Sequence, residues 1–231
     1  GKSSLFNAFL RLLEPQSGSI VIDGWNIGRI GLEDLRSRLY LVPQDPVILS
    51  GTLRSVLDVL GEFDDAKLLA CLEAVHLVTD DNSAGKSPFS NLDMPIAENG
   101  SNLSQGQRQL LCVARALLHK SRIVLFDEAS SCIDYTTDMR ITETVHQVFD
   151  KCTVITIAHR LRTVIGYDKV MYMDHGKIME LDEPAKLLDD KSSHFYRLCK
   201  QTGPAEFQFL VEAAKQAASK RQAPLTIAAS S

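Results

Sequence analysis

Two neighbouring acids follow an apolar run near the middle of the chain. Asp127 and Glu128 come directly after Ile123-Val124-Leu125-Phe126, so a strand over 123–126 brings Asp127 out at its carboxyl end. A carboxylate in that place can hold Mg²⁺ directly or through water. Glu128 then points elsewhere and can polarise an attacking water as a general base. Two neighbouring acids in a loop would be unremarkable alone. Here they follow an expected buried strand, and a Ser-x-Gly-Gln turn that opens a helix precedes them at 104–107; together these features predict a site that hydrolyses a nucleotide.

The first four residues predict a phosphate-binding helix start. Gly1-Lys2-Ser3-Ser4 matches the last part of a G-x-x-x-x-G-K-[ST] loop, of which the first glycine and the next four residues are not in this chain. Backbone N–H groups of Gly1 to Ser4 would cradle phosphate oxygens, Lys2 would bring a charge to the β- and γ-phosphates, and Ser3 would offer its hydroxyl to Mg²⁺. A helix start with a solvated lysine is the alternative, which the motifs further along the chain outweigh.

The segment 102–110, Asn-Leu-Ser-Gln-Gly-Gln-Arg-Gln-Leu, supports two interpretations that do not exclude each other. Ser104 and Gln107 have the S-x-x-Q spacing of a capping box and predict a helix over 105–118. A helix N-terminus that carries Ser104 and Gly106 is also an anion site.

Two further polar residues follow short apolar runs. Gln44 comes next to Pro43, after the strand expected over 39–42, and could contact Mg²⁺ or the attacking water; a glutamine at the side of a turn is the alternative. His159 comes soon after the strand expected over 153–157 and could donate a hydrogen bond to a γ-phosphate. A single histidine is more often a structural residue.

These segments, in this order, resemble the ATP-binding cassette (ABC) family of transport ATPases from Gly1 to about Leu188. The segments are Gly1-Lys2-Ser3-Ser4, Pro43-Gln44-Asp45, 102–110, 123–128, Ser131-Cys132-Ile133-Asp134 and Ile157-Ala158-His159-Arg160. The resemblance implies that the chain is truncated within the Walker A loop. We therefore expect the chain by itself to bind ATP weakly and to be weak or inactive as an ATPase.

The resemblance also implies the cofactors, the partners and the place of the domain. ATP and Mg²⁺ would be bound, and Ser104, Gly106 and Gln107, in what we call the signature segment (102–110), would reach nucleotide held by a second cassette. Transmembrane domains would lie outside this chain, with the cassette on the cytoplasmic side. Catalytic roles fall to Glu128, His159 and Gln44.

Sequence details around these motifs most resemble the second nucleotide-binding domain of subfamily C (multidrug-resistance-associated) exporters. The details are the stretches 97–102 and 51–54. Gln105 stands where the commonest family form has a second glycine, and Ser131-Cys132-Ile133-Asp134 replaces the usual Ser-Ala-Leu-Asp. The competence of the opposite site and the transported substrate stay open.

Other functions of the same family are the alternatives. A non-transport ABC ATPase would bring a long coiled-coil insertion or basic arms, and the sequence contains neither. A regulatory cassette that binds ATP without hydrolysis is disfavoured by Glu128 and His159.

Composition excludes several classes of protein. The formal net charge of −4 and the absence of a Lys/Arg block argue against nucleic acid as a partner. Five widely spaced cysteines predict reduced, mostly buried thiols instead of a disulfide framework or a zinc site. No apolar run approaches the roughly 18 residues of a membrane-spanning helix.

The order of the elements predicts an α/β fold, a P-loop NTPase core with a mainly parallel sheet and an inserted helical lobe over about 45–120. We expect a cassette domain over 1–202 and a C-terminal tail over 203–231. The expected strands are 19–22, 39–42, 123–126 and 153–157, with a hairpin of 170–173 and 177–180. The expected helices are 4–13, 31–36, 51–74, 105–118, 137–149, 183–188, 195–200 and 205–220. Residues 79–100 are expected to form a long loop, and 222–231 to be unstructured.

Overall fold

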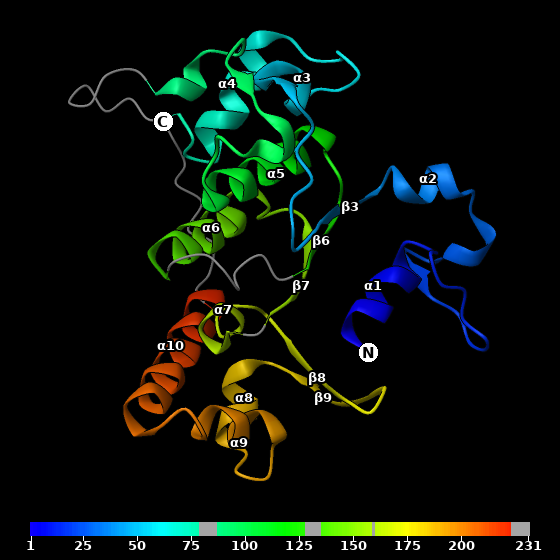
Figure 1. Ribbon diagram of the computed structural model, residues 1–231. Helices are drawn as coiled ribbons and strands as arrows, with labels where there is room; N and C mark the ends of the chain where they lie inside the picture. The colour runs from blue at the N-terminus through cyan, green and yellow to red at the C-terminus, as the bar shows by residue number, and fades with distance from the viewer. Residues whose placement is uncertain (79–86, 128–134, 159, 223–231) are drawn as a thin grey trace, which may run out of the picture. The chain divides into compact units, whose positions relative to one another are not determined.

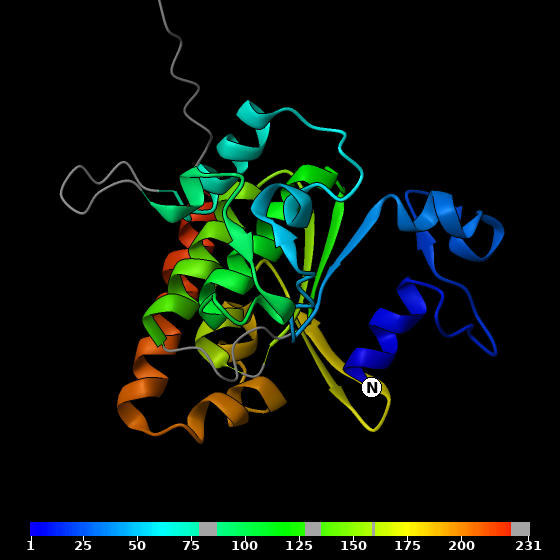
Figure 2. The same ribbon diagram turned by 45° about the horizontal axis from the view of Figure 1, so that its top comes forward.

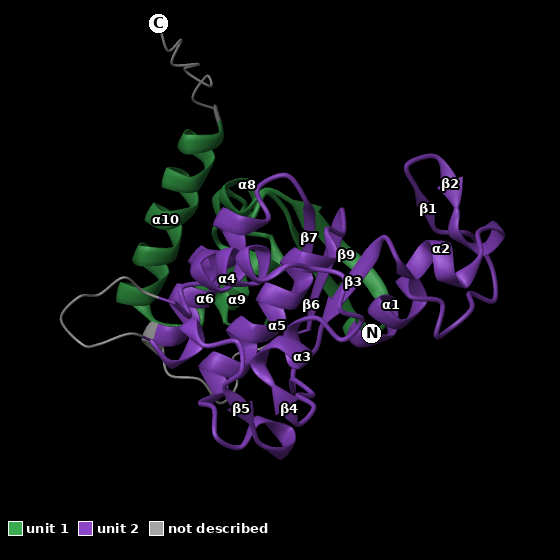
Figure 3. Cartoon of the chain, turned by 90° about the horizontal axis from the view of Figure 1, so that it is seen from above, with its two compact units in different colours: residues 1–2, 158–231 green, residues 3–157 purple. Residues whose placement is uncertain are grey.

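The computed structural model covers the whole chain and describes residues 1–78, 87–127, 135–158 and 160–222. It divides into two compact units (Figure 3). The first unit described below is Ser3–Ile157, labelled unit 2 in Figure 3, and the second is Gly1–Lys2 with Ala158–Ser231, labelled unit 1 there.

A three-stranded parallel sheet forms the centre of the first unit (Figure 1). Its order is β3 (Leu39–Val42), β6 (Ile123–Asp127), β7 (Thr153–Ile157). Val42 pairs with Phe126 and Asp127 pairs with Ile157, so the three strands end at the same edge. The strands expected over 39–42, 123–126 and 153–157 are confirmed, and β6 runs one residue further, to Asp127. The parallel sheet confirms the expected fold class.

The two faces of this sheet bury different side chains, because successive residues of a strand point to opposite sides. Val42, Val124 and Phe126 belong to the core shared with α4, α5 and α6, whereas Leu39 and Leu125 belong to the core shared with α1 and α2. Figure 2 shows these two groups of helices on opposite sides of the sheet. The helices are α1 (Lys2–Phe9), α2 (Leu32–Arg36), α4 (Asp65–Ala74), α5 (Gln105–His119) and α6 (Tyr135–Val148).

Helix α1 ends earlier than its apolar spacing predicts. Arg11 takes a left-handed conformation (φ 51°), and the N–H groups of Arg11 and Leu12 donate to the carbonyls of Ala8 and Asn7 at 3.1 and 2.8 Å. This is the pattern of a Schellman C-cap. Leu12 and Leu13 therefore lie beyond the helix and are exposed, so their expected place on its apolar face is wrong.

A two-residue turn follows α1 in the first unit. Strands β1 (Val21–Ile22) and β2 (Trp25–Asn26) pair in antiparallel fashion through Asp23-Gly24. The strand expected over 19–22 is thus confirmed for Val21 and Ile22 only, and its pairing with β2 was not predicted. Both turn residues have positive φ, 49° and 82°, which the mirror-image hairpin turn requires. The 3₁₀ turn η1 (Ile27–Arg29) comes next.

The chain between β3 and β6 holds the expected helices, and the helical stretch expected over 51–74 contains two of them. They are α3 (Leu53–Leu57) and α4, with a break between them because the Asp58 carboxylate accepts from the Phe63 N–H (2.8 Å) and Asp64 caps α4. Leu60, in this break, is 79% exposed.

The described part of the long loop has short elements of its own. These are β5 (Pro95–Ile96) and the 3₁₀ turns η2 (Pro88–Ser90) and η3 (Glu98–Gly100); β5 pairs with β4 (Gly51–Thr52), which lies just before α3. Residues 79–86 lie outside the described residues. The bounds of a separate helical lobe stay a prediction.

The second unit combines the expected hairpin with helices. The hairpin is β8 (Val170–Asp174) and β9 (Lys177–Asp182), and the helices are α7 (Leu161–Val164), α8 (Pro184–Asp189), α9 (His194–Lys200) and α10 (Pro204–Gln222). Phe195 and Cys199 of α9 share a core with Leu210 and Ala214 of α10. Residues 223–231, expected to be unstructured, lie outside the described residues.

Glu180 ties β9 to the start of α9. Its carboxylate accepts from the Ser193 hydroxyl (2.9 Å), the Phe195 N–H (3.1 Å) and the His194 N–H. Burial raises the pKa of Glu180, but these hydrogen bonds outweigh it and hold the pKa below the ordinary value. The acid is a structural cap for α9.

The cysteines of the described residues are packing residues. Cys71, Cys112, Cys152 and Cys199 are free thiols, three of them buried, and Cys132 lies outside the described residues. Burial raises the pKa of Cys112 to about 11 and that of Cys199 to about 12. Such thiols are almost wholly protonated at neutral pH and therefore poor nucleophiles. Within the described residues, no helix has the length and apolar character needed to span a membrane.

One ion pair fastens α10 to α7. The Arg162 Nε donates to Glu206 at 2.6 Å, a second N–H of the same guanidinium bonds the other carboxylate oxygen, and the guanidinium lies 4.4 Å from the centre of the Phe209 ring. The hydrogen bond from Arg162 lowers the pKa of Glu206. The pair is part-exposed, so its worth is that of a well-formed surface pair, about 0.5–1 kcal/mol.

We predict that Glu206→Gln lowers the free energy of unfolding by about 0.5–1 kcal/mol at pH 7. Because the folded pKa of Glu206 is depressed, this contribution is present above the unfolded pKa of about 4.3 and is lost as pH falls through the folded value. Urea unfolding of wild type and variant at several pH values checks this. Glu212→Gln, an exposed acid on the same helix that accepts from the neutral Gln208, is the control. A difference that stays constant down to pH 3 would contradict the assignment.

Candidate functional site

Asp127 is the last residue of β6, the middle strand of the sheet. It shares its strand face with Ile123 and Leu125, which pack into the core that α1 covers. The Asp127 carboxylate thus stands at the carboxyl edge of the sheet, on the face that carries α1. Ligands of open parallel sheets bind at this edge.

Helix α1 packs on that same face and carries residues that were predicted to bind phosphate. Phe6 is buried with Leu125 and Ile157, and Ser3 and Ser4 are exposed in the first turn of the helix. Lys2 is the first helical residue, and Gly1 comes immediately before it. The first N–H groups of a helix have no intrahelical acceptor, so this turn can bind an anion.

Gln44 lies near the same edge. Val42 ends β3 opposite Phe126, so the chain beyond Val42 runs past the level of Asp127, and Gln44 is exposed there. Glu128 and His159 follow the ends of β6 and β7, but both lie outside the described residues, as do Ser131 to Asp134. The topology brings Ser3, Gln44 and Asp127 to one region.

The start of α5 is the predicted capping box. The Ser104 hydroxyl accepts from the Gln107 N–H at 3.1 Å, and the Gln107 side-chain oxygen accepts from the Ser104 N–H at 2.9 Å. Ser104 remains exposed, whereas the amide oxygen of Gln107 is used in the cap. The structure therefore gives Gln107 a local structural role; its contact with nucleotide stays a prediction.

Gly106 and Gln109 carry information that the sequence did not give. A Cβ atom on Gly106 would lie 2.5 Å from the Thr137 Cγ2 on α6, so α5 and α6 approach closely at this point. Gln109 is 1% exposed, and its amide has no hydrogen-bond partner among the described residues. The sequence signal for the burial of Gln109 was its position, one turn after Gly106, on the face of the helix where the other residues are small or apolar.

The donor set fits a hard divalent cation. Asp127, Ser3 and Gln44 offer carboxylate, hydroxyl and amide oxygens, which Mg²⁺ prefers. Among the described residues, no three His, Cys, Asp or Glu side chains gather as they would in an all-protein metal site. A magnesium ion held by one carboxylate and completed by water and substrate phosphates needs no such cluster.

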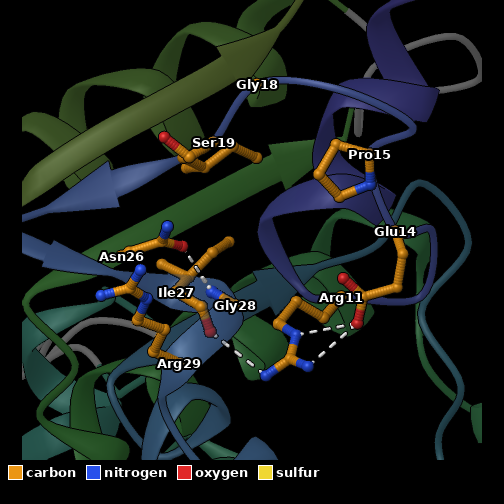
Figure 4. Close-up of a pocket in the computed structure, with 10 residues that line it drawn as sticks. Arg11, Glu14, Pro15, Gly18, Ser19, Asn26, Ile27, Gly28 and Arg29 are labelled. Atoms are coloured by element: carbon orange, nitrogen blue, oxygen red, sulfur yellow. Dashed lines mark hydrogen bonds and ion pairs between the residues drawn. The ribbon is translucent and has the colours of Figure 1, made fainter.

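A separate cavity of about 220 Å³ lies at the other end of α1 (Figure 4). The Arg11 guanidinium at its wall donates to the carbonyls of Ile27 (3.1 Å) and Ile30 (2.8 Å) and pairs with Glu14 at 3.0 Å. These bonds hold η1 against the end of α1. The cavity is thus distinct from the first turn of the helix, where Ser3 and Ser4 lie.

Comparison with known proteins decides the family of this arrangement. The profile described as "ABC transporter" matches residues 1–131, more than half of the chain. The chain belongs to the ABC transporter family.

Curated relatives of this ABC domain are much longer proteins. The human ATP-binding cassette sub-family C member 4 is 46% identical over 225 residues, which are 97% of this chain and 16% of that protein. A pleiotropic ABC efflux transporter of multiple drugs from Candida glabrata is 43% identical over 228 residues, 94% of this chain and 14% of that protein. The ABC domain thus spans about one seventh of their length.

A solved structure shares the fold of the ABC domain. The structure of a bacterial Atm1-family ABC exporter with ATP bound superposes with a TM-score of 0.77 at 28% identity, covering 88% of this chain and 35% of that one. The expected resemblance to subfamily C exporters and the expected P-loop core are confirmed.

We predict that Ser104→Ala and Ser104→Asp have different effects on the stability of the ABC domain. Alanine removes the cap of α5 and should cost about 1 kcal/mol, whereas aspartate caps a helix as well as serine does and should cost little. Urea unfolding measures both. Ser101→Ala, an exposed serine three residues earlier, is the control. Equal losses for alanine and aspartate at position 104 would mean that the hydroxyl does not act as a cap.

Proposed function

We propose that this chain is the ATP-binding and ATP-hydrolysing motor domain of a membrane exporter, most like the second cassette of a subfamily C exporter. The observation that carries the proposal is the position of Asp127 at the carboxyl end of the middle strand, on the sheet face that carries the Gly-Lys-Ser helix α1. The names of the relatives, efflux transporter of multiple drugs and ATP-dependent bile acid permease, support export.

In this proposal the residues at the carboxyl edge bind Mg²⁺ and ATP. Backbone N–H groups of Gly1 to Ser4 hold phosphate oxygens, and Lys2 adds a positive charge. Ser3, Asp127 and Gln44 supply oxygen atoms to Mg²⁺, which when bound would offset charge on the phosphates.

Hydrolysis needs a base and a stabilised transition state. Glu128 takes a proton from a water molecule as the water oxygen forms a bond to the γ-phosphorus, and the bond to the bridging oxygen of ADP breaks. Gln44 orients that water, and His159 donates a hydrogen bond to a γ-phosphate oxygen that gains charge. These roles follow from the positions of the residues in the family motifs.

A second cassette completes the site in this proposal. Ser104, Gly106 and Gln107 act on nucleotide that the partner cassette holds, and closure of the two cassettes moves transmembrane domains that lie outside this chain. The exposed helix start at Ser104, an anion site in its own right, supports this. The domain would then stand on the cytoplasmic side of the membrane, with 1–202 as the cassette and 203–231 as its extension.

The alternatives are a non-transport ABC ATPase and a regulatory cassette without hydrolysis. The relatives named as transporters disfavour the first. A regulatory cassette without hydrolysis would differ from the proposed motor domain in one measurement, because its ATP hydrolysis would not depend on Glu128.

We predict that Glu128→Gln in the full-length protein lowers steady-state ATP hydrolysis by at least about a hundredfold, because it removes a general base. ATP binding should persist, since the phosphate and Mg²⁺ ligands remain. Hydrolysis assays and nucleotide photolabelling measure the two effects. Glu143→Gln, an exposed acid on α6, is the control. Turnover within about twofold of wild type, a loss below ~0.4 kcal/mol in the barrier, would refute the role of Glu128.

We predict that Ser104→Asp in the full-length protein blocks ATP-driven closure while this cassette still binds nucleotide. The variant keeps the cap of α5 but brings a negative charge to an anion-facing helix start. Crosslinking between the two cassettes reports closure, and photolabelling of each cassette reports binding. Loss of labelling on this cassette with crosslinking intact would show that the signature segment serves its own site.

A further inference from the structure

The first turns of α5 and α6 are in contact at the point where the signature segment enters its helix. Gly106 is the second residue of α5 and is buried, and Thr137 is the third residue of α6. A Cβ on Gly106 would stand 2.5 Å from the Thr137 Cγ2 and 3.8 Å from the Thr137 Cβ. Carbon atoms attract each other best at about 3.5–4.0 Å, so any side chain at position 106 would push the two helices apart.

Thr137 cannot easily yield to such a side chain. It is β-branched, and threonine in a helix is largely restricted to two χ1 rotamers. The methyl group that Gly106 faces can therefore move aside only by a change of rotamer, which also moves the Thr137 hydroxyl. Interiors packed at this density transmit a displacement to their neighbours instead of absorbing it.

The contact joins the two parts of the proposed site. Helix α5 leads through three residues into β6, which ends at Asp127 and pairs with β7, the strand that follows α6. The Gly106–Thr137 contact thus fixes the first turn of α5 against the helix that comes after the metal-binding strand. Ser104 is the N-cap of that same turn.

We propose that Thr137 is a positioning residue for the signature segment. Its methyl group, packed on Gly106, sets where Ser104 and Gly106 stand relative to the sheet edge that carries Asp127. This inference rests on the proposed function, in which the signature segment acts on nucleotide. Position 106 then needs a residue without a side chain for two reasons: the close packing of α5 on α6 and the close approach of an anion.

The two requirements predict different results from the same variants. If the methyl group of Thr137 is what excludes a side chain at position 106, removing that methyl should make alanine tolerable there. If nucleotide alone excludes the side chain, a change at Thr137 should rescue nothing. Thr137→Ser is the suitable second change, because it deletes Cγ2 and keeps the hydroxyl.

The experiment is a double-mutant cycle in the full-length protein. Gly106→Ala should lower ATP-driven crosslinking and turnover per folded molecule about tenfold, with photolabelling of this cassette unchanged. Gly106→Ala combined with Thr137→Ser should return crosslinking and turnover to within about threefold of wild type. The Thr137→Ser single variant is measured as well, because the coupling between the two positions is calculated from both single variants and the double variant. Gly106→Ala with Thr137→Val, which retains the methyl group, should not recover.

Two further variants guard the result. Gly31→Ala, whose added Cβ would meet Asp34 Oδ2 at an ordinary 3.5 Å, is the matched glycine control. Thr137→Ile enlarges the side chain that faces Gly106 and should lower ATP-driven closure although Gly106 is unchanged. This variant therefore still tests the proposal if Gly106→Ala fails to fold.

The failures are distinguishable. If the double variant has no more crosslinking and turnover than Gly106→Ala, Thr137 does not position the signature segment, and the proposed function is unaffected. Normal closure in Thr137→Ile would lead to the same conclusion. If Gly106→Ala and Ser104→Asp both close normally, the proposed function of the signature segment itself is wrong.

Discussion

The parallel pairing of β6 between β3 and β7 is the constraint on which the site depends. Because all three strands run the same way and in register, their ends meet at one edge, and Asp127 lies at that edge. Val124 and Leu125 are fully buried on opposite faces. Burial of each such side chain contributes about 2 kcal/mol, so displacement of β6 would be costly.

The two faces of β6 pack against different helices. The face of Leu125 and Asp127 receives α1, whose first turn can bind phosphate, and the face of Val124 and Phe126 receives α5 and α6. One strand therefore positions both an anion-binding helix start and the helix that carries the signature segment. The Asp127 carboxylate needs no separate element to position it, since Asp127 is the last residue of the strand.

The sequence predicted the sheet well because apolar runs bounded by polar residues define buried strands almost without context. The bounds of β3 and β7 agree with expectation, and β6 differs only by including Asp127. Helix ends were less predictable. The end of α1 depends on Arg11, which bonds carbonyl groups of Ile27 and Ile30 that are distant in sequence. The break before α4 depends on Asp58 folding back on Phe63.

The local chemistry of the site was also readable, but its packing was not. Ser104 and Gln107 are three residues apart, so their capping box is visible in the sequence. Gly106 and Thr137 are separated by a helix and a strand, and neither residue type alone indicates a contact. Gln109 looked like an ordinary polar helix residue, yet it is buried.

The buried amide of Gln109 bears on how firmly α5 is held. Leaving a buried polar group without a hydrogen bond costs roughly 1–3 kcal/mol, and no described residue offers this amide a partner. It lies one turn after Gly106 on the same side of α5, as the helical period requires. Farther along the two helices, Val113 of α5 and Val145 of α6 are buried in one core, so apolar packing holds the helices together there and offsets the cost of the Gln109 amide. At the start of α5 the close approach of Gly106 to Thr137 leaves no room for a side chain, so the position of Ser104 and Gly106 depends on this one contact with α6.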